Sequence, residues 1–279
     1  STPYSYNQTV SYWSVAGVRP PSGSDFDLQL SADPTLLFSP LLSSSQLGGS
    51  AVDYVVTDYN YAPTGTQYVR VHDFSGSGTY YLEWEDGANT LAVPSNTGSL
   101  SWGTNDVVKV WDVYLTAGTP YAFKLHEPGG NFVDFGISLF KPTQVAGTSY
   151  FNRSGYAATS DSAAGLDEQF TYTPTTTGWH GFVVYSNTPA FAATYDITVS
   201  NLLSEIPTLS SVATAAPANL SFYQNQNAWG IMGVRSPTTD NDNLYLYGNA
   251  AHTTLLASST PAANGTVDFV VGDFNSQVS

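Results

Sequence analysis

The segment Trp13-Ser14-Val15-Ala16-Gly17-Val18-Arg19 returns 216 residues later as Trp229-Gly230-Ile231-Met232-Gly233-Val234-Arg235. Three further blocks match in the same order: 25–30 with 241–246, 41–45 with 255–259, and 52–60 with 267–275. Four ordered matches over about fifty residues indicate an internal repeat rather than chance similarity. The first and last parts of the chain are therefore two copies of one kind of domain.

Short runs of alternating apolar and polar residues, bounded by Gly, Pro, Asn and Asp, recur along the whole chain, whereas helical periodicity is nearly absent. This alternation is typical of strands with one face in a core. It predicts strands at residues 11–18, 26–30, 51–57, 67–73, 79–85, 107–115, 121–126, 136–140, 169–173, 181–185 and 195–200. The predicted fold class is all-β, with tandem antiparallel β-sandwich domains of jelly-roll type.

Three domains are predicted. Residues 1–88 form the first copy of the repeat, residues 106–201 a different sandwich, and residues 219–279 the second copy, with linkers that dock against their neighbours between them. The repeated segment is expected to lie in a core, because a tryptophan buries a large apolar area. Each arginine in it is expected to pair with a recurring aspartate. The expected core positions are Trp13, Gly17, Arg19, Trp229, Gly233 and Arg235.

The second copy lacks two segments that follow the repeat in the first copy. There, residues 67–71 and 79–85 predict a hairpin that closes the sheet, whereas the sequence ends six residues after Asp273. The unpaired strand edges that remain favour pairing with another chain. Two explanations stay open. The chain is a fragment of a longer one, as its start without Met also indicates, or another subunit supplies the strands by β-strand addition.

The composition disfavours several classes of function. The 22 acidic and 7 basic side chains give a net charge of -15, which disfavours nucleic acids and anionic membrane surfaces as partners. No run of 18 apolar residues is present, so membrane insertion is not expected, and the lack of Cys excludes disulfides and cysteine-ligated metals. Only 10% of residues are charged, and the polar remainder is mainly Ser, Thr, Asn and Gly, which is typical of secreted and cell-surface proteins.

Four Asn-X-Ser/Thr motifs agree with export to a compartment that carries out N-glycosylation. They predict glycan attachment at Asn7, Asn152, Asn219 and Asn264. The alternative is that a chain rich in Asn, Ser and Thr produces such motifs by chance. Glycans are therefore one class of expected partner, besides copies of the chain itself.

Acidic residues recur at matching places in both copies and raise the question of a calcium site. A hard cation needs six to eight oxygen ligands. The alternative, which we favour, is that these side chains hydrogen-bond the local backbone in turns, because Asn241 and Asn243 replace two carboxylates in the second copy. No cofactor other than calcium is predicted. The candidate ligands are Asp25, Asp27, Asp58 and Asn60 in the first copy, and Asp240, Asp242, Asp273 and Asn275 in the second.

Catalytic motifs are missing, since the chain has no HExxH, GxSxG, P-loop or GxGxxG sequence. The 4 histidines share no spacing and are predicted to be structural. Glu83 and Glu85 lie two residues apart and project from one face of a strand, where they could act as a pair of carboxylates on a sugar. The two carboxylates of a glycosidase face each other across a cleft instead. We therefore predict that this face of the strand is solvated. The protein is therefore not expected to be an enzyme.

The part of the chain between the two copies resembles a known family. The motifs concerned are the strand Val110-Trp111-Asp112-Val113-Tyr114-Leu115, the turn Gly178-Trp179-His180-Gly181 and the closing strand Tyr195-Asp196-Ile197-Thr198-Val199. They are similar to those of the bacterial pre-peptidase C-terminal family, although Asp134-Phe135-Gly136-Ile137 stands where the family has Asp-Leu-Asp-Leu. The resemblance implies a jelly-roll sandwich that accompanies secreted enzymes or builds surface proteins without chemistry of its own, with calcium bound in some relatives. The flanking copies resemble diverged relatives of the same sandwich.

The expected function is that of a secreted, non-catalytic structural subunit that assembles head to tail by β-strand addition. A head-to-tail contact that does not close into a ring generates a filament, so the product would be an extracellular filament or surface layer. The alternative is an accessory module of a secreted hydrolase, which binds polysaccharide or protein substrate through exposed aromatic side chains. Self-association in buffer alone favours the first function, and retention on an insoluble substrate favours the second.

Overall fold

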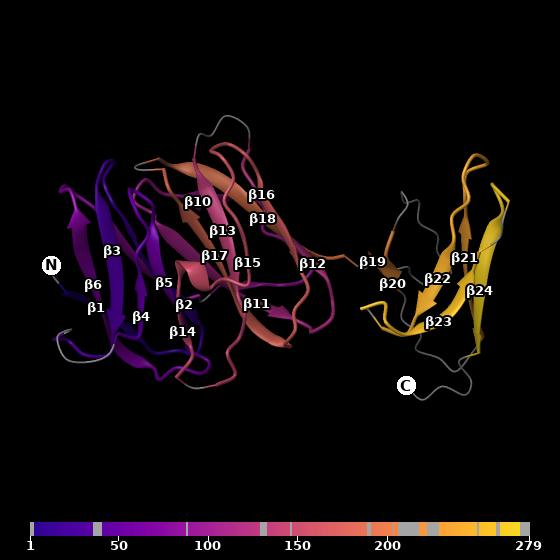
Figure 1. Ribbon diagram of the computed structural model, residues 1–279, viewed down its shortest axis with the longest axis horizontal. Helices are drawn as coiled ribbons and strands as arrows, with labels where there is room; N and C mark the ends of the chain where they lie inside the picture. The colour runs from indigo at the N-terminus through magenta and orange to yellow at the C-terminus, as the bar shows by residue number, and fades with distance from the viewer. Residues whose placement is uncertain are drawn as a thin grey trace. The chain divides into compact units, whose positions relative to one another are not determined.

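A computed structural model describes residues 3–35, 41–87, 89–128, 133–145, 147–188, 191–202, 204–205, 218–221, 229–249, 251–260 and 263–273. Within them the chain forms mainly antiparallel sheets, with one turn of 3-10 helix, η1 (Arg153–Gly155), and no helix long and apolar enough to cross a bilayer. The predicted all-β sandwich fold is confirmed. The chain divides into unit 1, residues 1–117 and 121–200, and unit 2, residues 118–120 and 201–279 (Figure 1).

The first sandwich of unit 1 has two four-stranded sheets, of order β1-β6-β3-β4 and β14-β5-β2-β7. Their strands are β1 (Pro3–Gln8), β2 (Trp13–Arg19), β3 (Asp25–Ser31), β4 (Ser43–Ser45), β5 (Asp53–Asp58), β6 (Gly65–Ser75), β7 (Tyr81–Glu85) and β14 (Tyr150–Asn152). Strand β14 comes from the middle of the chain and pairs with β5. Residues assigned to the second predicted domain therefore complete a sheet of the first.

The second sandwich of unit 1 has one sheet of order β15-β13-β17-β11-β8 and one of order β10-β18-β12-β16, where β9 also pairs with β18. Its strands are β8 (Thr90–Leu91), β9 (Ser95–Asn96), β10 (Leu100–Trp102), β11 (Val108–Leu115), β12 (Tyr121–His126), β13 (Phe135–Phe140), β15 (Ala158–Ser160), β16 (Glu168–Tyr172), β17 (Gly178–Ser186) and β18 (Ala193–Asn201). The segment between the two predicted domains supplies β8, β9 and β10, and it docks through the buried side chains of Leu91 and Trp102.

The four sheets of unit 1 stack face to face and enclose three apolar cores (Figure 1). The outer two cores lie inside the sandwiches, and the middle core lies between β2 and β5 of the first sandwich and β11, β13 and β17 of the second. Trp13 and Val15 face the middle core, whereas Ala16 and Val18 face the first. Every residue of β2 is therefore buried, in contrast to the half-buried strands that alternation predicts.

The hairpin predicted from residues 67–71 and 79–85 is wrong. β6 pairs with β1 and β3 in one sheet, whereas β7 pairs with β2 in the other. The connection between them passes through Gly76 and Gly78, whose φ angles of 86° and 136° favour glycine. The two strands thus complete both sheets of the first sandwich instead of closing one.

Unit 2 contains three two-stranded sheets among its described residues. They are β19 (Ser204–Glu205) with β20 (Leu220–Ser221), β21 (Trp229–Arg235) with β24 (Val267–Asp273), and β22 (Leu244–Tyr247) with β23 (Leu255–Ser259). Trp229 lies opposite Asp273 as Trp13 lies opposite Asp58. The pair β22–β23 matches β3–β4 in the same way. The repeat is therefore a repeat of strand register as well as of sequence.

Candidate functional site

The calcium ligands predicted in the first copy do not come together. Asp25 and Asp27 lie on β3, and Asp27 approaches Asp53 at the start of β5, whereas Asp58 is the last residue of β5. At about 3.3 Å per residue, the ends of this strand are roughly 17 Å apart. Asp58 accepts hydrogen bonds from the backbone N and the Nδ2 of Asn60, at 3.1 and 2.9 Å. This agrees with the alternative to calcium binding, in which these side chains hydrogen-bond the local backbone in a turn.

The ligands predicted in the second copy also make local bonds. The backbone N of Asp240 donates to the carbonyl of Pro237, that of Asp242 donates to Ser236 Oγ, and Asp273 ends β24. Asn275 lies outside the described residues. In the described part of the chain, no group of three or more His, Asp or Glu side chains could hold a metal ion.

All four predicted glycosylation sites are exposed. Asn7 lies on β1, Asn152 ends β14, Asn219 precedes β20, and Asn264 lies in the turn before β24. The Nδ2 of Asn264 donates to the carbonyl of Thr239 at 2.9 Å, so attachment there requires that bond to break. Glycan attachment at these four residues stays a prediction. Attachment requires an exposed asparagine side chain, and all four meet this condition.

In the first copy the repeated segment is buried, with Trp13 and Val15 in the middle core and Ala16 and Val18 in the first. Trp13 is fully buried, and its Nε1 donates to the backbone carbonyl of Trp179 at 2.9 Å. Gly17 is required by close packing, because a Cβ built there would lie 2.5 Å from Cγ1 of Val108. These contacts fix the first sandwich against the second.

Arg19 does not pair with an aspartate carboxylate, so that prediction is wrong. Its guanidinium donates to the backbone carbonyls of Asp106 and Thr104, at 2.6 and 3.1 Å, and lies 4.8 Å from the centre of the Tyr81 ring. Burial lowers the pKa of Arg19. Carbonyl dipoles and an aromatic face therefore compensate its charge at the rim of the middle core.

In the second copy the same segment is exposed, so the prediction that it lies in a core is wrong. Trp229 is 67% and Ile231 73% exposed, whereas Trp13 and Val15 are at 0%. Gly233 and Arg235 are exposed as well. The reason is that this face packs on β11, β13 and β17 in the first copy, whereas no sheet covers it in the described part of unit 2. Strand β24 shows the same contrast, with exposed Val267, Phe269 and Val271 against buried Val52, Tyr54 and Val56.

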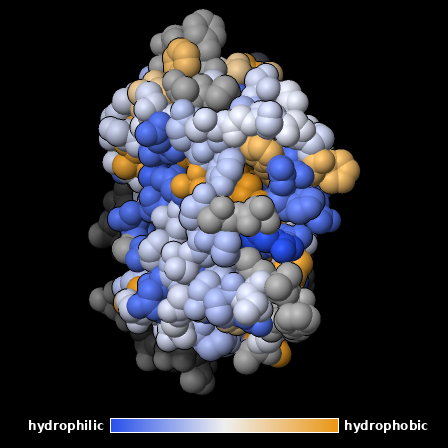
Figure 2. All heavy atoms as spheres, turned by 90° about the vertical axis from the view of Figure 1, so that its left-hand side faces the viewer, coloured by the Kyte–Doolittle hydropathy of each residue, from blue (hydrophilic) through white to orange (hydrophobic). Residues whose placement is uncertain are grey.

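The outer face of the first sandwich differs from this apolar face. On the side of the molecule that carries β1, β3 and β6, hydrophilic residues predominate and apolar ones form separate spots (Figure 2). Scattered apolar residues of this kind are normal on a protein surface, whereas a contiguous patch marks an interaction site. The face of β21 and β24 is therefore the stronger candidate for an interface.

Two strand edges of the second copy are open within the described residues. In the first copy β7 pairs along one edge of β2, and β6 along one edge of β3. In unit 2, β21 pairs with β24 alone and β22 with β23 alone, as far as the structure describes it. Such edges present unpaired N–H and C=O groups that another strand can bind.

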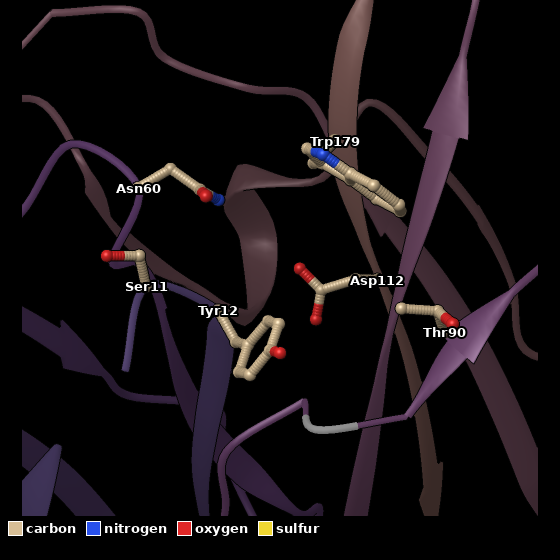
Figure 3. A pocket seen from close by; sticks show the side chains of 6 residues that line it. All are labelled: Ser11, Tyr12, Asn60, Thr90, Asp112 and Trp179. Carbon is tan, nitrogen blue, oxygen red and sulfur yellow. The ribbon is translucent and has the colours of Figure 1, made fainter. Parts of the chain in front are cut away.

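A pocket of about 130 Å³ lies where the two sandwiches of unit 1 meet (Figure 3). Two of its side chains are aromatic and partly exposed, Tyr12 at 37% and Trp179 at 41%, whereas Asp112 is only 2% exposed. In Figure 3 the carboxylate of Asp112 points between the rings of Tyr12 and Trp179. Small hydroxyl and amide side chains complete the lining: Ser11, Asn60 and Thr90.

Asp112 is buried with incomplete hydrogen bonding. Its Oδ1 accepts a bond from the backbone N of Trp13 at 3.3 Å, and its Oδ2 has no partner in the structure as described. Burial, helped by the carboxylates of Asp58 and Asp86, raises the pKa of Asp112 to about 7, against the opposing effect of the Trp13 bond. The backbone of Gly87 (φ 62°) packs beside Oδ2, since a Cβ there would lie 2.6 Å away.

Sequence reasoning missed this pocket. Its lining residues are spread from Ser11 to Trp179, and they meet only because the two sandwiches pack together. The available signal was the acid at position 112, which interrupts the apolar run 110–115 of β11. An acid among core-facing residues is a candidate functional group because its burial is costly.

The other acids and histidines considered from the sequence have structural partners. Glu83 Oε2 accepts the backbone N–H groups of residues 107 and 108, and Lys109 Nζ binds both Glu83 and Glu85, at 3.1 and 2.8 Å. This pair is therefore half-buried, which corrects the predicted solvated face. His180 is fully buried, and burial lowers its pKa to about 4.

Comparison with known proteins finds matches among solved structures alone. No family model and no curated protein matches the chain. Among solved structures it is similar to the pre-peptidase C-terminal domain of a collagenase from Bacillus anthracis, with 16% identity over 40% of this chain and 92% of that one, and a TM-score of 0.30. It is also similar to CorA, a surface-associated copper-binding protein of Methylomicrobium album BG8 (11% identity, 40% and 98% covered, TM-score 0.30). A third similar structure is PliG, a periplasmic inhibitor of g-type lysozyme from Aeromonas hydrophila. The identity is 14% over 40% of this chain and 96% of that one, with a TM-score of 0.26.

Proposed function

We propose that the protein is a secreted, non-catalytic structural subunit whose copies join head to tail into an extracellular filament or surface layer. Unit 2 of one copy accepts strands from the next copy. The observation that carries the proposal is the exposed apolar face of β21 and β24, whose counterparts in the first copy are fully buried against the sheet that contains β11. The next copy would have to cover this face with a sheet as well as donate strands to its edges. Apolar area of this kind gains about 25 cal/mol for every Å² removed from water.

The first copy supports the proposal by indicating where added strands belong. There β6 lies between β1 and β3, and β7 lies beside β2. Strands added to β22 and β21 at these positions would extend both sheets of the second copy from two strands to three. In β6 the side chains of Gln67, Val69 and Val71 are buried at alternate positions. A donated strand therefore needs inward-facing residues at every second position, while main-chain hydrogen bonds give most of the affinity.

Secretion is supported by the composition and by the four exposed Asn-X-Ser/Thr sites. The low charged fraction of 10% leaves a surface of hydroxyl and amide groups. A non-catalytic role is supported by the lack of catalytic motifs in the sequence. Glu83, Glu85 and His180 are also engaged in structural contacts.

The oligomeric state of the full chain tests the proposal. We expect association that grows with protein concentration by analytical ultracentrifugation, and filaments or sheets by electron microscopy. Ile231→Asp, on the exposed face of β21, should abolish association. Phe74→Asp is the matched control, because Phe74 is equally exposed at 70% but lies on β6 of unit 1. A folded monomer at every concentration, or equal effects of the two substitutions, would overturn the proposal.

The accessory-module alternative is favoured by the aromatic side chains at the pocket of unit 1. Tyr12 and Trp179 are partly exposed there beside hydroxyl and amide groups, a composition typical of binding pockets. If this alternative holds, the chain stays monomeric and is retained on an insoluble polysaccharide or protein substrate. Trp179→Ala should then release it.

A further inference from the structure

We infer that the pocket between the two sandwiches of unit 1 binds a primary ammonium group through the carboxylate of Asp112. The group belongs either to a free small amine or to the side chain of a lysine. The inference concerns residues of unit 1 and does not depend on the assembly proposed for unit 2.

The first argument is the unmet hydrogen bonding of Asp112. Asp53, another buried carboxylate of unit 1, accepts bonds from Ser45 Oγ at 2.5 Å and from Leu47 N at 3.0 Å. Asp112 has one bond of 3.3 Å, to Trp13 N, and an Oδ2 without a partner among the described residues. A buried carboxylate is costly unless it is paired and hydrogen-bonded. A ligand with N–H donors would satisfy it.

The second argument is charge. The carboxylates of Asp58 and Asp86 act on Asp112, and the described residues that line the pocket include no lysine or arginine. Both oxygens of Asp58 already accept bonds, from Asn60 and Thr143, so Asp58 acts through its charge rather than by contact. A cluster of one sign favours a ligand of the opposite sign. A neutral polyol would leave this charge uncompensated.

The third argument is the nature of the walls. A cation is attracted to the face of a tryptophan or tyrosine ring, and Trp179 and Tyr12 both line the pocket. The ring of Trp179 is held by an edge contact with Tyr114 at 5.3 Å, and its backbone carbonyl by Trp13 Nε1. The Nδ2 of Asn60 is bound to Asp58, which leaves its amide oxygen for a ligand N–H.

The fourth argument is size. The pocket volume of about 130 Å³ is close to that of a cavity of about 150 Å³ that holds one benzene molecule. One small group fits inside it, and any longer ligand would extend beyond it. An alkylammonium head satisfies the size, the charge and the donor requirement together.

Calorimetric titration of the full chain at pH 8 tests the inference. The probes are butylammonium chloride and, separately, Nα-acetyl-lysine amide, and 1-butanol is the uncharged control. We expect saturable binding of butylammonium and none of butanol. Asp112→Asn keeps an acceptor for Trp13 N and should weaken binding roughly 10- to 100-fold, the range for loss of a hydrogen bond to a charged group. Asp73→Asn removes the same charge from an exposed part of β6 and should leave the affinity unchanged.

The two probes distinguish the sources of the ammonium group. Binding of both supports a lysine side chain as ligand, and binding of butylammonium alone supports a free amine. Equal binding of butanol or glucose, unchanged affinity in a folded Asp112→Asn variant, or no binding of either amine would overturn the inference. If Asp112→Asn does not fold, Trp179→Leu replaces it, since this side chain is partly exposed and its loss should weaken butylammonium binding several-fold.

Discussion

Trp13 and Trp229 begin equivalent strands and lie opposite equivalent aspartates, yet one is fully buried and the other 67% exposed. The pairing of β2 with β5 and of β21 with β24 is thus a local property that the repeated sequence carries by itself. Burial depends on neighbours that, among the described residues, are found beside the first copy alone, namely β6, β7 and the sheet that contains β11. The comparison shows that the repeated sequence determines which strands pair, whereas the neighbouring strands and sheets determine which side chains are buried.

The largest expected difference between the copies is at the two tryptophans. Trp13→Ala should lower the free energy of unfolding of unit 1 by about 3–5 kcal/mol, because it leaves a cavity in the middle core. Trp229→Ala in the monomer should change that of unit 2 by less than about 0.5 kcal/mol, as for other surface substitutions. Urea unfolding of both variants measures this. Equal losses would mean that the face of β21 is covered in the monomer.

The next effect is a pH dependence confined to unit 1. Burial raises the pKa of Asp112 to about 7 and that of Asp53 to about 6, from an ordinary 3.8. A carboxyl with a raised pKa in the folded state binds its proton more tightly there than in the unfolded chain. The stability it contributes is therefore complete in acid and is lost as the pH rises through the folded pKa.

We expect the unfolding free energy of unit 1 to fall by about 2 kcal/mol between pH 5 and pH 8, because the loss of about 4 kcal/mol from the two carboxyls exceeds the gain of about 2 kcal/mol from His180, whose pKa is lowered to about 4. Asp112→Asn should remove most of this dependence. The measurement is urea unfolding at several pH values. A rise in stability over this range, or the same slope in the variant, would contradict the assignment.

A smaller contrast is expected at the paired glycines. Gly17→Ala forces a Cβ to within 2.5 Å of Val108 and should cost about 1–3 kcal/mol. At Gly233 the nearest atom to a Cβ is the carbonyl oxygen of Asp268 at 3.3 Å, on an open face. Gly233→Ala should therefore stay within about 0.5 kcal/mol of the parent. Thermal unfolding of the two variants side by side checks this.

The smallest effect is expected from calcium. A site occupied at a hundred times its Kd would stabilise the folded state by about 2.7 kcal/mol, and the candidate ligands are not gathered in either copy within the described residues. The Tm should therefore be the same in excess calcium and in chelator. A Tm that rises with calcium concentration would show that the ligands rearrange to bind it.

Much of the fold could be predicted because strand alternation is local. All eleven predicted strands occur, and the register of the repeat follows its sequence. The alternation of apolar and polar residues cannot indicate whether a second sheet covers the outer face of a strand. The burial of β2 on both faces and the exposure of β21 were therefore not predictable. The same limit applies to Arg19, whose acceptors are backbone carbonyls, and to the pocket at Asp112, which depends on how two sandwiches pack.

The insertion of β14 into the first sandwich has a consequence for the way unit 1 would respond to a pulling force. Residues Tyr150–Asn152 leave the second sandwich, pair with β5 and return. A pulling force along the chain therefore cannot extend the two sandwiches one after the other, since stretching the second tears a strand from the first. Unit 1 resists tension as a single link, with one rupture in place of two.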